Sequence, residues 1–198
     1  MSLYRDYMKF ILDWIAALIL LCVFLPIIFL SWLIASIDTK SNGFFLQSRV
    51  GRNGKVFKIV KIKTMYSARG ERSSITASIT NEISYSGKIF RKYKIDEIPQ
   101  LINIVLGQMS FVGPRPDVPG YADMLGEQDR CILNLRPGIT GPASIKYANE
   151  EEILSKVSDK KYYNDNVIWP DKVLINKMYY HECSLSKDIF YIYKTFLK

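Results

Sequence analysis

The sequence has few of the residues that build the commonest metal and nucleophile sites. His181 is the only histidine in 198 residues, and the three cysteines, Cys22, Cys131 and Cys183, have no pairing or metal-ligand spacing. A single histidine argues against His-based metal sites and against catalysis by Ser-His or Cys-His pairs. The cysteine pattern fits a reduced, cytosolic environment for the soluble part of the chain.

Acidic residues are scarce in the middle of the chain. Between Lys40 and Lys94 there are thirteen lysines or arginines but only two acids, Glu71 and Glu82, so this segment has a net charge of +11. Residues 95–198 are nearly balanced, with twelve basic and fourteen acidic residues. The excess positive charge is therefore local, and it predicts contact with anionic lipid headgroups or with phosphate.

Charge is absent altogether from residues 14–37, a run of 24 positions. About 20 apolar residues cross a hydrocarbon core as a helix, so the run predicts a membrane helix that is retained, not a cleaved signal peptide. Positive charge flanks both ends, which a straight single span does not satisfy. Pro26, near the middle, predicts a break, and these residues alone leave both a re-entrant hairpin and a kinked spanning helix open. We expect a membrane helix over residues 1–38 and one domain over residues 39–198.

Short strands and helices are predicted for that domain. Residues 44–65 are rich in Phe, Val and Ile and contain the turn sequence GRNG, which predicts a short β-hairpin. Helices are expected near residues 87–93, 96–106, 121–135, 150–161 and 171–198, and a mobile loop over residues 67–86. The expected fold class is α+β and mostly helical.

Asp96 and Glu97 are adjacent carboxylates at the end of the basic segment. The apolar residues that follow are spaced as one face of a helix, and Pro99 is favoured in a first helical turn, so the pair is expected at a helix N-terminus. Carboxylates and phosphates are both stabilised there. Taken alone, such a pair is more often a helix-dipole feature than a catalytic one.

Two proline-rich segments are expected to form rigid turns, because a helix interior does not accommodate their prolines. Residues 113–120, GPRPDVPG, hold Arg115 between two prolines, and residues 136–142, RPGITGP, begin with Arg136. An arginine with a fixed backbone suits bidentate recognition of phosphate.

Six motifs occur in a fixed order along most of the chain. They are FILD at 10–13, FFLQSRVG at 44–51, FKIVKIKTM at 57–65, IDEIPQLIN at 95–103, MSFVGPRP at 109–116 and LRPGITG at 135–141. This set resembles the bacterial sugar transferases, the small monotopic phosphoglycosyl transferases that start glycan assembly on a polyprenol phosphate. No single motif is specific, but the collinear set is.

The resemblance implies a re-entrant membrane helix with a break at Pro26, which enters and leaves on the cytoplasmic face of the bacterial inner membrane, followed by a small cytosolic catalytic domain. It implies that Asp96 is the nucleophile and that Glu97, with Asp96, holds Mg²⁺. The residues implied in binding substrate phosphate are Arg91, Arg115, Lys61 and Arg136, the last two more weakly. One departure is Leu25 before Pro26, where the family often has Ser.

The reaction implied is transfer of a sugar 1-phosphate from a UDP-sugar to polyprenol (undecaprenyl) phosphate, through a covalent intermediate on Asp96. Mg²⁺ is the implied cofactor, because it prefers carboxylate and phosphate oxygens. Membrane lipid is an expected partner, nucleic acid is not, and a homo-oligomer is left open. Two alternatives stay open: a one-step transferase with Asp96 as base, and a non-catalytic membrane-bound scaffold whose basic residues only bind lipid.

Overall fold

The structure, a computed structural model, describes residues 3–66 and 82–197. The chain folds into two compact units, which are described separately. Unit 1 comprises Met1–Ala16, Ser48–Phe57 and Ile104–Lys198, and unit 2 comprises Ala17–Gln47 and Lys58–Asn103. The described part is mostly helical, as predicted.

The described elements have the following bounds. The longer helices are α1 (Lys9–Thr39), α2 (Tyr85–Lys92), α3 (Gln100–Val105), α4 (Pro142–Lys146), α5 (Glu150–Ser155), α6 (Lys160–Tyr163), α7 (Trp169–Glu182) and α8 (Leu185–Phe196). Short 3₁₀ or π turns are η1 (Tyr4–Met8), η2 (Arg52–Gly54), η3 (Ile95–Glu97), η4 (Ala122–Met124), η5 (Arg130–Asn134) and η6 (Asn164–Ile168). The strands are β1 (Phe44–Val50), β2 (Val56–Ile62), β3 (Ser110–Val112) and β4 (Gly138–Thr140).

Helix α1 carries the predicted membrane segment. The helical stretch Tyr4–Thr39 is 36 residues long, its most apolar window has a mean hydropathy of 2.9, and only 17% of that window is buried. Large side chains such as Val23, Phe29 and Ile37 are more than half exposed. A helix that exposes so much apolar surface suits lipid better than water. By length and composition α1 can cross a membrane, as the sequence predicts.

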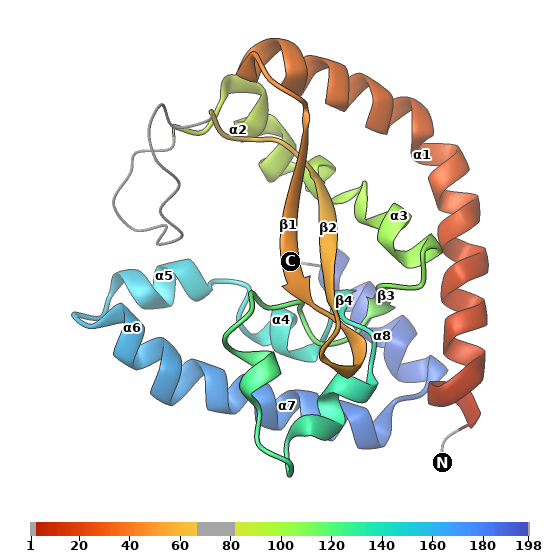
Figure 1. Cartoon of the computed structure of the whole chain (residues 1–198), viewed down its shortest axis with the longest axis vertical. Coiled ribbons are helices and arrows are strands. Elements are labelled where there is room, and N and C mark those ends of the chain that lie inside the picture. Colours follow the sequence, from red (N-terminus) through yellow and green to blue (C-terminus); the bar gives the residue numbers. More distant parts are fainter. Residues whose placement is uncertain (1–2, 67–81, 198) are drawn as a thin grey trace. The chain divides into compact units, whose positions relative to one another are not determined.

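Pro26 lies inside α1, and the helix continues through it as one uninterrupted ribbon (Figure 1). The predicted break at Pro26 is therefore not confirmed. Membrane helices tolerate proline because nearby groups satisfy the freed backbone. The re-entrant course of the helix stays a prediction.

The β-hairpin predicted from residues 44–65 is confirmed. Strands β1 and β2 form a two-stranded antiparallel sheet (Figure 1), joined through η2. Asn53 and Gly54 in that turn have φ angles of 57° and 75°. Asn and Gly tolerate this left-handed region better than other residues, so the turn sequence suits the tight reversal.

The core of unit 2 joins α1, β2 and α2. Ala35, Ile62 and Phe90 form a buried apolar cluster, against which Trp32, Phe44 and Ile95 pack. The end of α1 also holds the start of α2, because Asp38 Oδ2 accepts hydrogen bonds from the Ser86 backbone N–H at 2.8 Å and from its hydroxyl at 2.5 Å. These hydrogen bonds hold the N-terminus of α2 against the C-terminal end of α1.

Unit 1 contains a second sheet that the sequence did not reveal. Strands β3 and β4 are parallel, with Ser110 opposite Gly138 and Val112 opposite Thr140. Residues 136–142 were predicted as a rigid turn without a strand, and this expectation was incomplete. A three-residue strand leaves no period-2 pattern long enough to recognise in the sequence.

Three glycines make the two proline-rich segments interlock. A Cβ on Gly113 would lie 2.3 Å from the Arg136 carbonyl oxygen, and a Cβ on Gly138 or Gly141 would lie 2.2 Å from Gly113 backbone atoms. Real side chains never approach so closely, so only glycine fits at these three positions. Both segments are therefore packed backbone against backbone.

A buried ion pair fixes the start of α1 within unit 1. Lys9 Nζ lies 2.5 Å from Asp188 Oδ2, and the two residues are only 6% and 4% exposed. Tyr4 and Tyr179 also donate hydrogen bonds to Asp188, at 2.7 and 2.5 Å. Because a buried charge is costly unless it is paired and fully hydrogen-bonded, this cluster ties α1 firmly to α7 and α8.

Three helix predictions need correction. Residues 121–135 do not form one helix but the short turns η4 and η5, because Leu125 is extended and Gly126 disfavours helix between them. Residues 150–161 form α5 and then α6, which restarts where Asp159 caps it by accepting from Tyr162 N–H at 2.9 Å. The single helix predicted from residue 171 is two helices, because the chain is not helical at Cys183 and Ser184.

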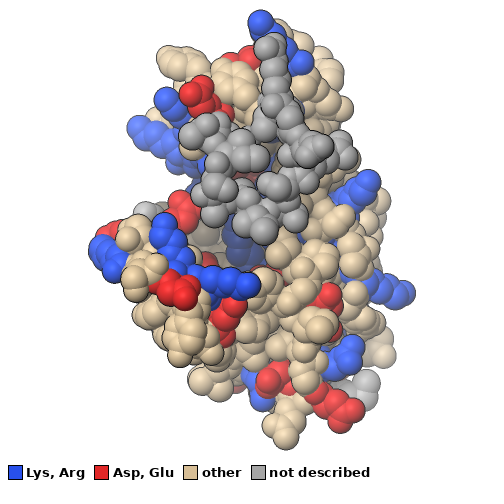
Figure 2. Space-filling model, turned by 60° about the vertical axis from the view of Figure 1, so that its left-hand side comes forward, with Lys and Arg blue, Asp and Glu red and all other residues tan. Residues whose placement is uncertain are grey.

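The predicted mobile loop, residues 67–86, lies mostly outside the described residues. Its described end is ordered: Ile83 forms an antiparallel bridge with Met65, and α2 begins at Tyr85. On the face drawn in Figure 2, Lys and Arg side chains lie interspersed with Asp and Glu side chains and do not form one continuous patch.

Candidate active site

Asp96 and Glu97 lie on the 3₁₀ turn η3, directly before α3. The pair was predicted in the first turn of one helix over residues 96–106, and the structure differs in detail. Pro99 has no N–H to donate to the Ile95 carbonyl, which instead accepts from Ile98 N–H at 3.2 Å. Lys94 precedes the turn with a φ of 56°. The two carboxylates therefore lie on a short 3₁₀ turn that is separate from α3.

The Asp96 carboxylate is mostly buried and incompletely hydrogen-bonded. Its Oδ1 is inaccessible to solvent and has no hydrogen-bond partner among the residues that the structure describes. Burial raises the pKa of Asp96, the negative charge of Glu97 raises it further, and Lys61 and Arg91 act in the opposite direction. A buried oxygen left without a donor costs about 1–3 kcal/mol, so it is uncommon in a merely structural carboxylate.

Glu97 forms an ion pair with Lys61 of β2. The Lys61 Nζ to Glu97 Oε1 distance is 2.9 Å, and each side chain is 19% exposed. Arg91, at the end of α2, donates from Nε to Thr64 Oγ1 at 2.9 Å. Within the described residues the Arg91 side chain makes this one hydrogen bond, and the residue is otherwise exposed to solvent. Both cations thus lie beside the acidic pair.

Two further residues that the sequence did not single out hold the site together. Asn103 of unit 2 bridges to β2: its Oδ1 accepts from Val60 N–H at 3.0 Å, and its Nδ2 donates to the Lys58 carbonyl at 2.8 Å. Gly87 allows α2 to touch the chain after β2, because a Cβ there would lie 2.2 Å from the Thr64 carbonyl oxygen. Asn103 falls inside a quoted motif and Gly87 does not, and nothing in the sequence marked the contacts of either residue.

Arg115 and Arg136 belong to unit 1. Arg115 is exposed, and it follows Pro114 in the segment that is interlocked through Gly113. Arg136 donates from Nε to the Gly107 carbonyl at 2.9 Å, and its guanidinium lies 4.2 Å from the centre of the Phe10 ring. Burial lowers the pKa of Arg136. Arg136 is thus held by Gly107 and Phe10 within unit 1.

The structure thus brings together four of the predicted site residues within unit 2, namely Asp96, Glu97, Lys61 and Arg91. The donor set suits Mg²⁺, which commonly takes one or two carboxylates and completes its shell with phosphate and water. The unpartnered Asp96 Oδ1 beside a second carboxylate is consistent with a bound cation, because a cation would offset their repulsion. No group of three or more His, Cys, Asp or Glu side chains gathers in the described residues.

The sequence profile of a family described as bacterial sugar transferase matches residues 4–198. The chain therefore belongs to the bacterial sugar transferase family, as the motifs indicated, and it is a transferase. The long apolar helix and this family membership together indicate a membrane-associated protein.

Individual relatives agree with the family. An uncharacterized sugar transferase, EpsL, of Bacillus subtilis (strain 168) is 33% identical over 159 residues, which cover 80% of this chain and 78% of that protein. The UDP-glucose:undecaprenyl-phosphate glucose-1-phosphate transferase of Caulobacter vibrioides is 32% identical over 145 residues, 71% of this chain and 54% of that protein. The UDP-N-acetylgalactosamine-undecaprenyl-phosphate N-acetylgalactosaminephosphotransferase of Aeromonas hydrophila is 28% identical over 174 residues, 84% of this chain and 41% of that protein. The chain spans about half the length of the last two.

Proposed function

We propose that the protein transfers a sugar 1-phosphate from a UDP-sugar to a polyprenol phosphate, and that Asp96 carries the phosphosugar between the two substrates. Undecaprenyl phosphate is the acceptor named for the Caulobacter and Aeromonas relatives, and it is the acceptor proposed here. The products are UMP and polyprenol-diphosphate-sugar, as in the first membrane step of glycan assembly.

The reaction has two phosphoryl-transfer steps. In the first, an Asp96 carboxylate oxygen bonds to the sugar-proximal phosphorus, and the bridging P–O bond breaks with its electron pair leaving on UMP. In the second, an oxygen of polyprenol phosphate bonds to the same phosphorus, and the Asp96 carboxylate leaves. Dividing the transfer in this way lets a soluble donor and a membrane-bound acceptor react in turn.

The observation that carries the proposal is that the Asp96 carboxylate is buried and incompletely hydrogen-bonded. One of its oxygens is buried and unpartnered within the described residues, while Lys61 and Arg91 lie close enough to lower its pKa. A poorly solvated carboxylate is a stronger nucleophile than one that is saturated with hydrogen bonds.

The other site residues would bind and orient phosphate. Arg91 is held at Nε by Thr64, which fixes the plane of its guanidinium and leaves its outer face toward solvent for bidentate binding. Lys61 offsets the charge of Glu97. Arg115, on its rigid turn, would contact substrate phosphate, while the contacts of Arg136 with Gly107 and Phe10 favour a structural role.

Glu97, together with Asp96, would hold Mg²⁺, which when bound would offset the charge of the diphosphate and of the departing UMP. The membrane helix, residues 1–38, would keep the catalytic domain, residues 39–198, on the cytoplasmic face of the inner membrane. A polyprenol phosphate presents its headgroup only at that interface, so an anchored enzyme meets it by lateral diffusion.

Trapping the intermediate tests the proposal. The full chain is incubated with a UDP-sugar that is labelled in the sugar, without a lipid acceptor, and then denatured. We expect labelled wild-type protein, loss of the label on addition of polyprenol phosphate, and no labelling of Asp96→Asn. Asp123→Asn is the matched control, because within the described residues the Asp123 side chain accepts one hydrogen bond, from Gly120 N–H through Oδ1, which Asn retains.

The alternatives predict different results. A one-step transferase with Asp96 as base would give sequential kinetics and no labelled protein, whereas the proposed mechanism gives ping-pong kinetics. A non-catalytic scaffold would release no UMP from any UDP-sugar and would be indifferent to chelation of Mg²⁺ and to Glu97→Gln. Full turnover by Asp96→Asn would show that Asp96 is not the nucleophile.

A further inference from the structure

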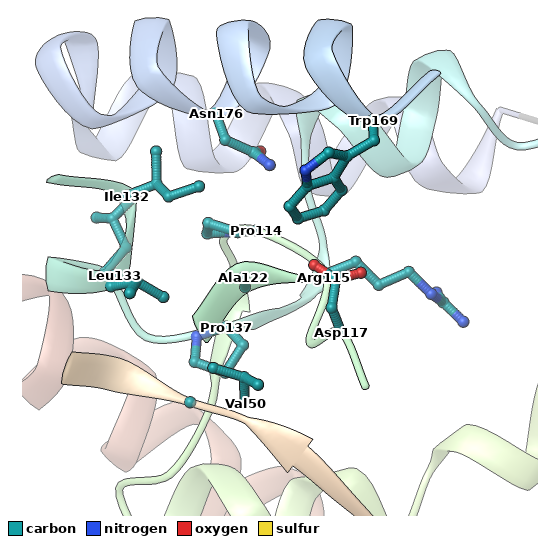
Figure 3. Close-up of a pocket in the computed structure, with 12 residues that line it drawn as sticks. Val50, Pro114, Arg115, Asp117, Ala122, Ile132, Leu133, Pro137, Trp169 and Asn176 are labelled. Carbon is teal, nitrogen blue, oxygen red and sulfur yellow. The ribbon is translucent and has the colours of Figure 1, made fainter. Parts of the chain in front are cut away.

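Unit 1 contains a small pocket, separate from the residues assigned above except for Arg115. Its walls come from the end of β1, the Pro114 to Asp117 turn, η4, η5, the start of the segment at Pro137 and α7. The cavity has a volume of about 20 Å³, which is room for one water-sized group, because such a group needs roughly 10–15 Å³. Figure 3 shows the Trp169 indole and the Asn176 amide entering it from α7, with Asp117 on the opposite side.

Two polar side chains in this pocket have unmet hydrogen-bonding capacity. Asn176 is 6% exposed, and its Oδ1 has no partner among the described residues. The Asp117 carboxylate makes no hydrogen bond within the described part of the chain, although the Asp117 carbonyl accepts from Val50 N–H at 2.9 Å. The backbone of this turn is therefore secured without the carboxylate, which points into the pocket (Figure 3).

Charge and aromatic surface complete the pocket. Lys172, Arg49 and Arg115 are near enough to lower the pKa of Asp117, yet burial, with a smaller contribution from Glu150, raises it to about 6. The Trp169 ring is held edge-on by Tyr121, with ring centres 5.4 Å apart. A fixed indole face beside a carboxylate and an amide suits an aliphatic C–H surface that carries a hydroxyl, because the ring packs the carbon and the oxygens accept the proton.

We propose that Asp117, Asn176 and Trp169 form a specificity pocket for one hydroxyl of the donor sugar. This rests on the proposed function. Arg115 contributes to the wall of the pocket and its guanidinium extends away from the other lining side chains (Figure 3), so a phosphate bound there would lie outside the cavity, beside the turn that carries Asp117. The hydroxyl donates to the Asp117 carboxylate and occupies the cavity. The pocket thereby favours a hydroxyl over a hydrogen atom at that sugar position, because only the hydroxyl can donate to the carboxylate.

Matched donors and variants test this assignment. UMP release is measured for the full chain with a preferred UDP-hexose and with its series of monodeoxy analogues. For one analogue, we expect kcat/KM to fall about 10- to 100-fold in the wild type, the amount typical of a hydrogen bond to a charged group. Asp117→Asn should lose a similar factor on the parent donor but little more on that analogue, which is the pattern of a direct contact.

The controls separate this pocket from the overall function. Asp123→Asn lies outside the pocket and should discriminate among the donors like the wild type. If the wild type releases no UMP from any donor, the proposed function fails. If the wild type is active but Asp117→Asn slows all donors by one common factor, the pocket is only the site of a structural water and the inference is wrong. Asn176→Ala provides the same comparison if Asp117→Asn does not fold.

Discussion

The Lys61 ammonium of β2 lies 2.9 Å from a Glu97 carboxylate oxygen, directly beside the Asp96 carboxylate. The strand that supplies the cation and the turn that supplies the two anions are joined again by Asn103, which bonds to the backbone of β2 on both sides of residue 59. A substitution in β2 is therefore expected to alter the surroundings of the Asp96 carboxylate.

Replacement of Lys61 by Met should reduce kcat/KM about 10- to 100-fold, because the ion pair between Lys61 and Glu97, at a mostly buried position beside Asp96, would be lost, a loss of roughly 1–3 kcal/mol. Lys61→Arg should recover part of the rate. Lys58→Met is the control, because Lys58 is exposed on the same strand and contributes only its carbonyl to Asn103. Equal rates for Lys61→Met and the wild type would contradict this assignment.

The Thr64 hydroxyl should matter through Arg91. Thr64→Val keeps the shape of a residue that is only 7% exposed but removes the acceptor for Arg91 Nε. We expect a rise in KM for the UDP-sugar of about 5- to 10-fold, the effect of one lost hydrogen bond, with Thr64→Ser close to the wild type. Steady-state kinetics of the three proteins check this, and a similar KM for the Val and Ser variants would argue against a positioning role.

Gly87→Ala should be strongly destabilising. The added Cβ would lie 2.2 Å from the Thr64 carbonyl oxygen, so α2 must move away from the chain that follows β2. Overpacking of this kind typically costs about 1–3 kcal/mol. Thermal unfolding of the detergent-solubilised protein measures it. Gly126→Ala is the matched control, because a Cβ there meets nothing within 4 Å, and its melting temperature should stay at the wild-type value.

The stability of unit 1 should decrease as the pH rises from about 4 to about 6, because the buried Asp117 carboxyl loses its proton over this range. Burial raises the pKa of this carboxyl to about 6, whereas in the unfolded chain the value is about 3.9. The folded state therefore keeps its proton to higher pH, and the free energy of unfolding falls as that proton is lost, by at most about 3 kcal/mol.

Asp117→Asn should remove this dependence. Relative to the wild type, the variant should gain melting temperature at pH 7 and show little difference at pH 4. The neighbouring charges that set the pKa, Lys172, Arg49, Arg115 and Glu150, are unchanged in it. Parallel pH profiles for the two proteins would show that Asp117 does not titrate in this range.

The sequence predicted those features that depend on local chemistry. The hairpin follows from the turn at Asn53 and Gly54, and the apolar helix follows from an uncharged run of the right length. The grouping of Lys61 with Asp96 and Glu97 came from the family resemblance, since no periodicity joins residues that are 35 positions apart. The contact of Arg91 with Thr64 is of the same non-local kind and was not anticipated.

The failures have a common physical cause. The β3 and β4 strands are too short to show a pattern, and their pairing depends on three glycines whose spacing in the sequence gives no sign of contact. Residues 121–135 have a helical distribution of apolar residues, yet Gly126 and the packing of Ala122 and Leu133 against Val50 prevail. The pocket at Asp117 depends on tertiary contacts of this type and was likewise not predicted.

The contact among Gly113, Gly138 and Gly141 has a consequence for how this enzyme can change. Arg115 and Arg136 lie in two separate stretches of sequence, and the backbones of these stretches are packed together at the three glycines with no space for a methyl group. Neither stretch can be shifted at these glycines without displacing the other. An evolving or engineered variant would therefore have to alter substrate preference through side chains, such as Asp117, while the two backbones stay as they are.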